Sequence, residues 1–173
     1  MNNKYLKEFM YILYLFFISS ILGGILESFY KLYLFHTFEI GGFMYGPWRP
    51  IYGFGCLLLY FITKKIQGSN VKIFFSSMIV CTVFEYMSSF MLELIFQKSW
   101  WDYSNEILNL NGRICLFHSI IWGLLGVIFL KLIEPFLRKA FNQVEFKKIS
   151  YFTIFLFVIY HVDSLFSWIR NLR

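Results

Sequence analysis

The chain has 173 residues, of which 58% are hydrophobic and only 15% are charged. A soluble domain of this size needs far more polar surface to cover its core, so the composition predicts an integral membrane protein. We expect a single transmembrane domain over residues 1–173. The net charge of +6 does not indicate nucleic-acid binding, because the basic residues lie in short pieces between apolar runs, as topology signals do.

The apolar runs predict an all-α, polytopic helix bundle with about five transmembrane helices, since a membrane-spanning helix needs about 20 mostly apolar residues. The first run is too long for a signal peptide, and no A-x-A-like cleavage site follows it. In chain order the predicted helices are Phe9–Tyr30, Pro50–Ile66, Val71–Phe96, Ile114–Ile133 and Ile149–Trp168.

The distribution of lysine and arginine predicts the orientation of this bundle in the cell membrane. Basic residues are more frequent before the first segment and after the second and fourth than in the remaining connections, and basic residues favour the cytoplasmic side. We therefore expect the N-terminus in the cytoplasm and the C-terminus outside. The residues expected inside are Lys4, Lys7, Lys64, Lys65, Lys72, Lys131, Arg138, Lys139, Lys147 and Lys148.

Each of the first two predicted hairpins has a carboxylate on its outgoing helix and an arginine at the start of its returning helix. These residues are Glu27 and Arg49 in the first hairpin, and Glu85 and Arg113 in the second. Both hairpins start from the predicted cytoplasmic side, so the pattern fits a parallel repeat about an axis along the membrane normal.

Glu85 is the most informative charge because it lies near the middle of a predicted span. A carboxylate in the hydrocarbon region costs a few kcal/mol unless it is paired or hydrated. Glu85, Ser89 and Glu93 share one helix face, which we expect to point into the bundle. Two interpretations remain open: a functional site, or a structural role in which Glu85 pairs with an arginine or is protonated and shares a hydrogen bond.

The segment "WWDYSNEILNLNGRICL", residues 100–116, is predicted to form an outer loop. Trp100 and Trp101 suit the membrane–water interface. The loop would place Asp102, Asn111 and Arg113 over the mouth of the bundle that contains Glu85. The residues that we predict to bind substrate are therefore Glu27, Glu85, Asp102, Asn111 and Arg113.

The sequence predicts neither a metal ion nor a cofactor. Cys56, Cys81 and Cys115 form no CxxC pair, and we interpret them as small buried side chains. His118, His161 and Asp163 lack the spacing of a metal-binding helix motif.

Five stretches, "GPWRPIYGFG", "EYMSSFMLELIF", "WWDYS", "NLNGRICL" and "WGLLG", resemble a bacterial membrane family described as putative ABC-transporter type IV, or putative ABC transporter permease. The resemblance covers roughly Gly23 to Gly126. One departure is Arg49, since the family commonly has a cysteine just before "PIYG". The resemblance implies transport together with a separate ATPase subunit, because this chain has no P-loop pattern of its own.

Three functions remain open at this point. The first is a permease-like subunit in which Glu27, Glu85 and Arg113 line a path; five helices are few, so we expect a homo-oligomer. The second is an intramembrane enzyme for a lipid or lipid-linked substrate, with Glu85 as acid/base and Arg113 holding a phosphate or carboxylate. The third is a scaffold whose polar residues only lock helices together.

The longest predicted cytoplasmic element is "EPFLRKAFNQVEFKK", residues 134–148. Phe136, Leu137, Phe141 and Val144 would form an apolar stripe above basic residues. This pattern fits a coupling helix for an ATPase subunit. It is more typical of an amphipathic helix that lies on anionic membrane lipids, which is the interpretation we favour.

Overall fold

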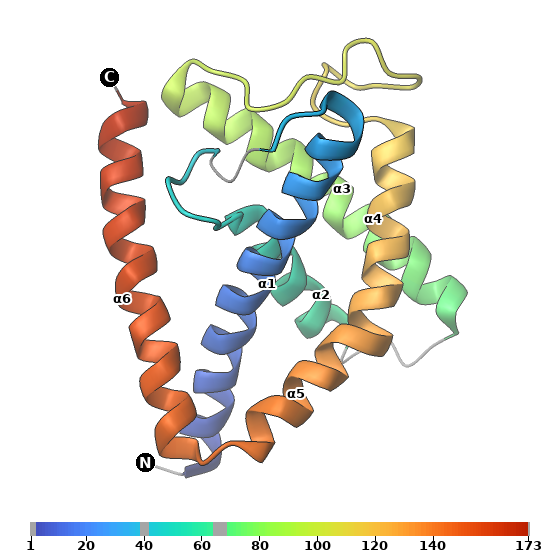
Figure 1. The fold of residues 1–173 in the computed structure, drawn as a ribbon. Helices are drawn as coiled ribbons and strands as arrows, with labels where there is room; N and C mark the ends of the chain where they lie inside the picture. Colours follow the sequence, from blue (N-terminus) through green and yellow to red (C-terminus); the bar gives the residue numbers. More distant parts are fainter. Residues whose placement is uncertain (1–2, 39–41, 64–68, 173) are drawn as a thin grey trace. The chain divides into compact units, whose positions relative to one another are not determined.

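The computed structural model describes residues 3–38, 42–63 and 69–172, and within them it confirms an all-α fold (Figure 1). The π-helical turn η1 joins α4 to α5, so that Leu116–Gln143 is one continuous helical run. Counted in this way, the described residues form five helices. The elements are α1 (Asn3–Phe35), α2 (Pro50–Thr63), α3 (Asn70–Phe96), α4 (Leu116–Ile128), η1 (Phe129–Ile133), α5 (Glu134–Gln143) and α6 (Phe146–Asn171).

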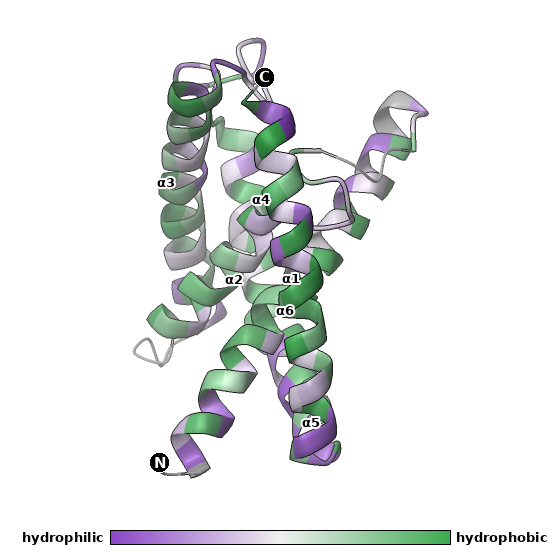
Figure 2. Cartoon of the chain, turned by 90° about the vertical axis from the view of Figure 1, so that its left-hand side faces the viewer, coloured by the Kyte–Doolittle hydropathy of each residue, from purple (hydrophilic) through white to green (hydrophobic). Residues whose placement is uncertain are grey.

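Four of these helices are long and apolar enough to cross a membrane. They are Lys4–Tyr33, Asn70–Phe96, Leu116–Gln143 and Phe146–Asn171. Hydrophobic residues occupy most of each helix, and hydrophilic residues gather near helix ends and in the connections (Figure 2). The chain is therefore a polytopic membrane protein, and the side on which each terminus lies stays a prediction.

Helix α2 is shorter than the others. It begins at the predicted residue, Pro50, but has 14 residues and a length of about 21 Å. The hydrocarbon core of a bilayer is about 30 Å thick. The predicted end of this segment, Ile66, and the predicted cytoplasmic Lys64 and Lys65 lie outside the described residues.

The described chain divides into two compact units, which are treated separately below. Unit 1 comprises Met1–Leu57 and Pro135–Arg173, and unit 2 comprises Leu58–Glu134. The single domain expected from the sequence stays a prediction. In unit 1, α1 and α6 contact each other around a core that includes Phe16, Phe17, Met44, Trp48 and Leu156.

Part of the connection between α1 and α2 is buried in this core and lies against α1. The backbone N–H of Arg49 donates to the carbonyl oxygen of Ser20 at 3.0 Å, near the middle of the candidate span. The carbonyl of Pro47 lies so close to Gly24 that any Cβ there would overlap it. An extended segment thus precedes the short helix α2, and whether this part of the chain crosses the membrane stays a prediction.

In unit 2, α3 and α4 pack closely. The buried residues of α3 recur every four positions, as expected for one helix face, and they are Ile73, Ser77, Cys81, Glu85 and Ser89. The facing residues of α4 are small: a Cβ at Gly126 would overlap Ser77. The opposite face of α3 exposes Ile79, Val83 and Met87, which suits contact with lipid.

Helix α5 packs against the beginning of α1. Leu137 and Phe141 are buried, and the Phe141 ring meets the Tyr11 ring edge-on at 5.2 Å. Arg138 donates to Glu8 at 2.9 Å. The predicted apolar stripe is therefore divided: Leu137 and Phe141 are buried, with Phe141 against α1, while Phe136 and Val144 are exposed. Lipid or ATPase contact at this exposed part stays a prediction.

Candidate functional site

Glu85 is almost completely buried, with 4% of its surface exposed. Two neutral groups donate hydrogen bonds to its carboxylate. The hydroxyl of Tyr103, from the loop after α3, donates to Oε1 at 3.2 Å, and Nε1 of Trp122, from α4, donates to Oε2 at 2.9 Å. Among the described residues Glu85 forms no ion pair. The site is therefore a buried acid satisfied by neutral donors.

A second layer of side chains holds Tyr103 in place. Its ring stacks on the imidazole of His118, with centroids 4.2 Å apart and planes 17° from parallel. His118 Nδ1 also contacts the Cys115 thiol, at 3.1 Å between nitrogen and sulfur. Cys115, the residue just before α4, accepts a hydrogen bond from Ser119 on its carbonyl oxygen. The start of α4 thus fixes the tyrosine that bonds Glu85.

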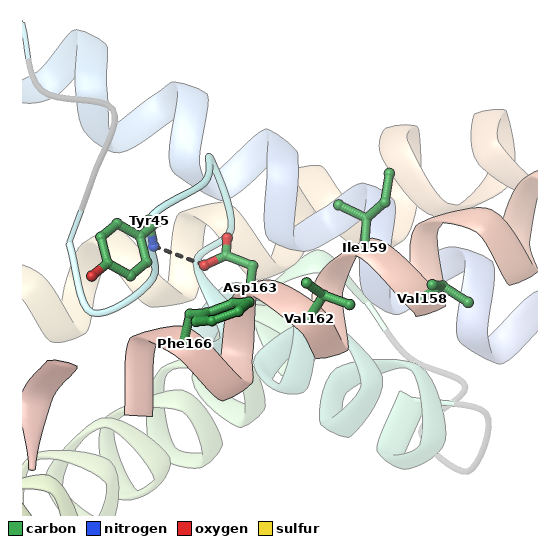
Figure 3. A pocket seen from close by; sticks show the side chains of 6 residues that line it. All are labelled: Tyr45, Val158, Ile159, Val162, Asp163 and Phe166. Carbon is green, nitrogen blue, oxygen red and sulfur yellow. Dashed lines mark hydrogen bonds between the residues drawn. The ribbon is translucent and has the colours of Figure 1, made fainter. Parts of the chain in front are cut away.

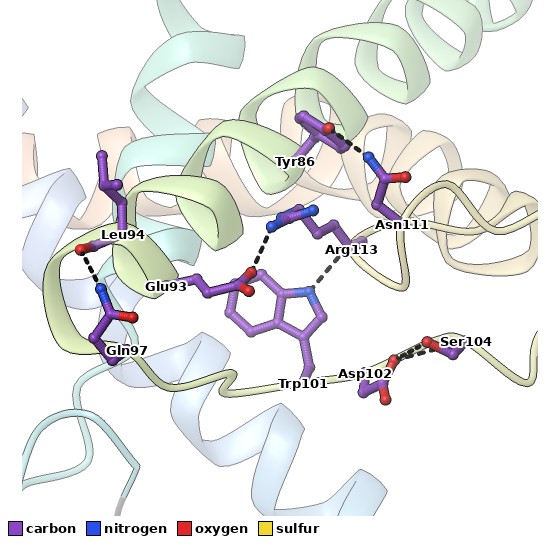
Figure 4. Close-up of polar contacts among 9 residues, drawn as sticks. All are labelled: Tyr86, Glu93, Leu94, Gln97, Trp101, Asp102, Ser104, Asn111 and Arg113. Carbon is purple, nitrogen blue, oxygen red and sulfur yellow. Dashed lines mark hydrogen bonds and ion pairs between the residues drawn. The ribbon is translucent and has the colours of Figure 1, made fainter.

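Arg113 pairs with Glu93, about two helical turns beyond Glu85 (Figure 4). Its guanidinium also lies 5.7 Å from the Tyr86 ring centroid and 5.6 Å from that of Phe90. The hairpin pattern set Arg113 with Glu85, but its partner on α3 is Glu93. The carboxylate is Glu93, so an ion pair between Glu85 and Arg113 is not what holds these elements together.

Asn111 and Gly112 form a tight turn. Both have positive φ, 55° and 67°, as the central residues of a type I′ turn do, and the Arg113 N–H donates to the Leu110 carbonyl at 3.0 Å. The Asn111 side chain donates to the Tyr86 hydroxyl at 2.9 Å (Figure 4). The Asn-Gly dipeptide is a strong turn signal, and it explains Asn111 without a substrate.

Asp102 stabilises the same loop. Its Oδ1 accepts hydrogen bonds from the Ser104 hydroxyl, at 2.5 Å, and from the Ser104 backbone N–H, at 2.9 Å, an arrangement typical of an Asx turn. These bonds hold the pKa of the Asp102 carboxyl below its ordinary value of 3.8. Substrate binding by Asp102 and Asn111 stays a prediction, and both residues already have structural roles.

The first predicted pair, in unit 1, is present. Arg49 is 6% exposed, and its Nε lies 2.9 Å from Glu27 Oε2. Lys31 lies 3.7 Å from the other carboxylate oxygen. Glu27 and Glu85 belong to different units, so their participation in one common site stays a prediction.

Asp163 of α6 has a structural role that the sequence did not reveal. Its two carboxylate oxygens accept hydrogen bonds from the backbone N–H groups of Tyr45, at 3.0 Å, and Gly46, at 2.7 Å. Ser167, one turn further on, donates to the same carboxylate. Asp163 thereby ties the connection after α1 to α6, beside a shallow groove lined by Tyr45, Val158, Ile159, Val162, Asp163 and Phe166 (Figure 3). This role could not be predicted from the sequence, because the backbone N–H groups that donate to Asp163 lie far from it in the chain.

Four long apolar helices and a buried carboxylate satisfied by neutral donors define a polytopic membrane protein with an internal polar site. The chain belongs to the family described as putative ABC-transporter type IV, whose profile matches residues 14–168. The matched region extends on both sides of Gly23–Gly126, the stretch that contains the five motifs. No curated protein and no solved structure matches the chain.

Proposed function

We propose that the chain is the permease-like membrane subunit of an ABC-type transporter, and that Glu85 lies at the centre of its polar path. The observation that carries this proposal is the burial of Glu85 in the middle of α3 with two neutral donors and no cationic partner among the described residues. A carboxylate that only locked helices together would be expected to pair with a cation. Family membership supplies the transport class.

The ATPase would be a separate subunit, because the sequence contains no P-loop pattern. The exposed side of α5 and the following turn is the candidate docking surface. Phe136 and Val144 are apolar and exposed there, and the exposed Lys139 and Lys147 lie on the same stretch of chain. This surface would lie in the cytoplasm if the N-terminus does.

The permease would act as a homo-oligomer in the bacterial plasma membrane. Helix α6 supports this proposal, because only 17% of its apolar 18-residue stretch is buried inside the protein. The corresponding share for α1 is 56%. A second copy or membrane lipids must cover the apolar remainder. An assembly would also supply the helices that a path through the membrane requires.

The main alternative is an intramembrane enzyme that acts on a lipid or lipid-linked substrate. The contact between Cys115 and His118 favours it, because a thiol beside an imidazole is the usual arrangement of a nucleophile and its base. The ion pair between Arg113 and Glu93 weighs against it, since the proposed anion-binding arginine already has a carboxylate partner. A scaffold without a site is the third possibility, and it is disfavoured because Glu85 has no cationic partner among the described residues.

Purification from native membranes in mild detergent, followed by mass spectrometry of everything that stays bound, tests the proposal. We expect a stoichiometric ATPase subunit, lost when Phe136→Asp is introduced on α5 and retained in the control Ile107→Asp, in the exposed loop after α3. A stable, correctly inserted chain that retains a lipid but no ATPase would contradict the permease and favour the enzyme.

A further inference from the structure

The two hydrogen bonds to Glu85 differ in a way that matters for protons. An indole N–H can only donate, so Trp122 always requires an acceptor at Oε2. A phenol hydroxyl can donate or accept, so Tyr103 serves Oε1 in either role. The site is therefore asymmetric: one carboxylate oxygen must remain an acceptor, whereas the other can carry a hydrogen.

Both protonation states of Glu85 are consequently satisfied by the same side chains. In the ionised state, Trp122 donates to Oε2 and Tyr103 donates to Oε1. In the protonated state, Trp122 still donates to Oε2, while the hydrogen on Oε1 is donated to the Tyr103 oxygen. Only the hydroxyl hydrogen of Tyr103 has to rotate, which requires no movement of heavy atoms.

Among the described residues of unit 2, the groups that face Glu85 supply no fixed positive charge. The loop contributes Tyr103, and α4 contributes Trp122 and, behind the tyrosine, His118. On α3 the buried neighbours one turn away are Cys81 and Ser89. Further along, the charges of Glu93 and Arg113 neutralise each other. A proton is the positive charge that this site can accept without any further ligand.

We propose that Glu85 is a reversible proton-binding site that exchanges its proton with the loop side of the protein through Tyr103. Tyr103 is only half-buried, whereas Glu85 is buried, so the tyrosine stands between the acid and water. On binding, a proton from water forms the O–H bond at Oε1, and the carboxylate loses its charge. On release, the proton returns to water and the carboxylate accepts from Tyr103 again. Coupling of this step to transport rests on the function proposed above, but proton binding itself does not.

Infrared difference spectroscopy of the protein in lipid vesicles measures this binding directly. A protonated carboxyl group has a C=O stretching band that a carboxylate lacks, and the chain has only 10 Asp and Glu residues. We expect a band that appears as the pH falls and is absent in Glu85→Gln, the isostere of the protonated acid. Glu93→Gln is the matched control on the same helix and keeps the band.

Tyr103→Phe supplies an independent test, since it removes the hydroxyl while leaving the ring stacked on His118. The band of Glu85 should remain but shift in frequency and in the pH of its midpoint, because one hydrogen bond is lost. The proposal is overturned if wild type and Glu85→Gln give the same pH-difference spectrum. It is also overturned if Tyr103→Phe leaves the band unchanged. Neither result depends on whether an ATPase subunit binds, so the proposed function can fail separately.

Discussion

Arg113 forms its ion pair with Glu93 and not with Glu85, although both carboxylates lie on α3 about two helical turns apart. The Glu93 side chain is 45% exposed, whereas Glu85 is buried. The two carboxylates of α3 therefore have different roles, which the sequence did not distinguish. Glu93 and Arg113 hold the loop to α3, and Glu85 is left with neutral partners.

The first prediction concerns this ion pair. Arg113→Ala should lower the stability of the loop against α3, because it removes a charge-assisted hydrogen bond and the contacts with Tyr86 and Phe90. Since 45% of the Glu93 side chain is exposed, we expect a coupling free energy of only about 1 kcal/mol. A double-mutant cycle of Arg113→Ala and Glu93→Ala, followed by thermal unfolding in detergent, measures it. Strictly additive effects of the two substitutions would show that the pair contributes nothing.

Gly112 provides a prediction about the turn. Its φ is positive, and a Cβ would overlap Asp102 and Ser104. Gly112→Ala should therefore destabilise the loop by about 1–2 kcal/mol from backbone conformation alone. The matched control is Gly55→Ala in α2, where an added Cβ meets nothing within 4 Å. This substitution should stabilise the helix by up to about 1 kcal/mol, because alanine has the higher helix propensity. Proteolysis of the loop in intact vesicles reports the first change, and equal cleavage in Gly112→Ala and wild type would contradict it.

Asp163 provides a prediction for unit 1. Asp163→Asn replaces one carboxylate oxygen by an NH2 group, which cannot accept a hydrogen bond, so the N–H of either Tyr45 or Gly46 loses its acceptor. We expect a loss of about 2 kcal/mol, the value typical of a hydrogen bond to a charged group, and faster hydrogen exchange in residues 42–48. Asp163→Glu, which keeps the charge, should recover part of the protection. Unchanged exchange at Tyr45 and Gly46 in Asp163→Asn would contradict the role assigned to this residue.

The pH dependence of the loop follows from Asp102. Its pKa in the folded protein is lower than the ordinary value of 3.8, so ionised Asp102 favours the folded loop. This contribution is fully present above the ordinary pKa and is lost as the pH falls through the lower folded pKa. Ser104→Ala removes a hydroxyl donor and should move the carboxyl pKa back toward 3.8. Carbon-detected NMR titration of Asp102 measures both values, and identical values in wild type and Ser104→Ala would contradict this account.

Much of the helical fold follows from the sequence, because long apolar runs allow few structures in a membrane. The hairpin pattern also predicted the pair of Glu27 and Arg49. The close approach of Pro47 to Gly24 was not predicted, since it is a tertiary contact. The partners of Glu85 were not predicted either. Tyr103 and Trp122 come from two other segments, and neither has a spacing that relates it to α3.

Asn111 and Asp102 have structural roles that the sequence analysis did not predict, while substrate binding by them stays a prediction. Polar residues between apolar helices indicated a binding site, although an Asn-Gly dipeptide and an Asp two residues before Ser104 are also turn signals. The structure uses both residues within the loop. Glu85 remains the residue for which burial in a membrane helix, without a charged partner among the described residues, is not explained by local structure.

The most direct test of the central claim is the ATP turnover of the purified assembly containing wild type, Glu85→Gln or Glu93→Gln, at equal occupancy of the ATPase subunit. If Glu85 lies in the transport path, Glu85→Gln should change ATP turnover several-fold although no nucleotide contacts it, and Glu93→Gln should remain close to wild type. Equal turnover in all three assemblies, with Glu85→Gln changing only the melting temperature, would contradict the claim and leave Glu85 with a purely structural role.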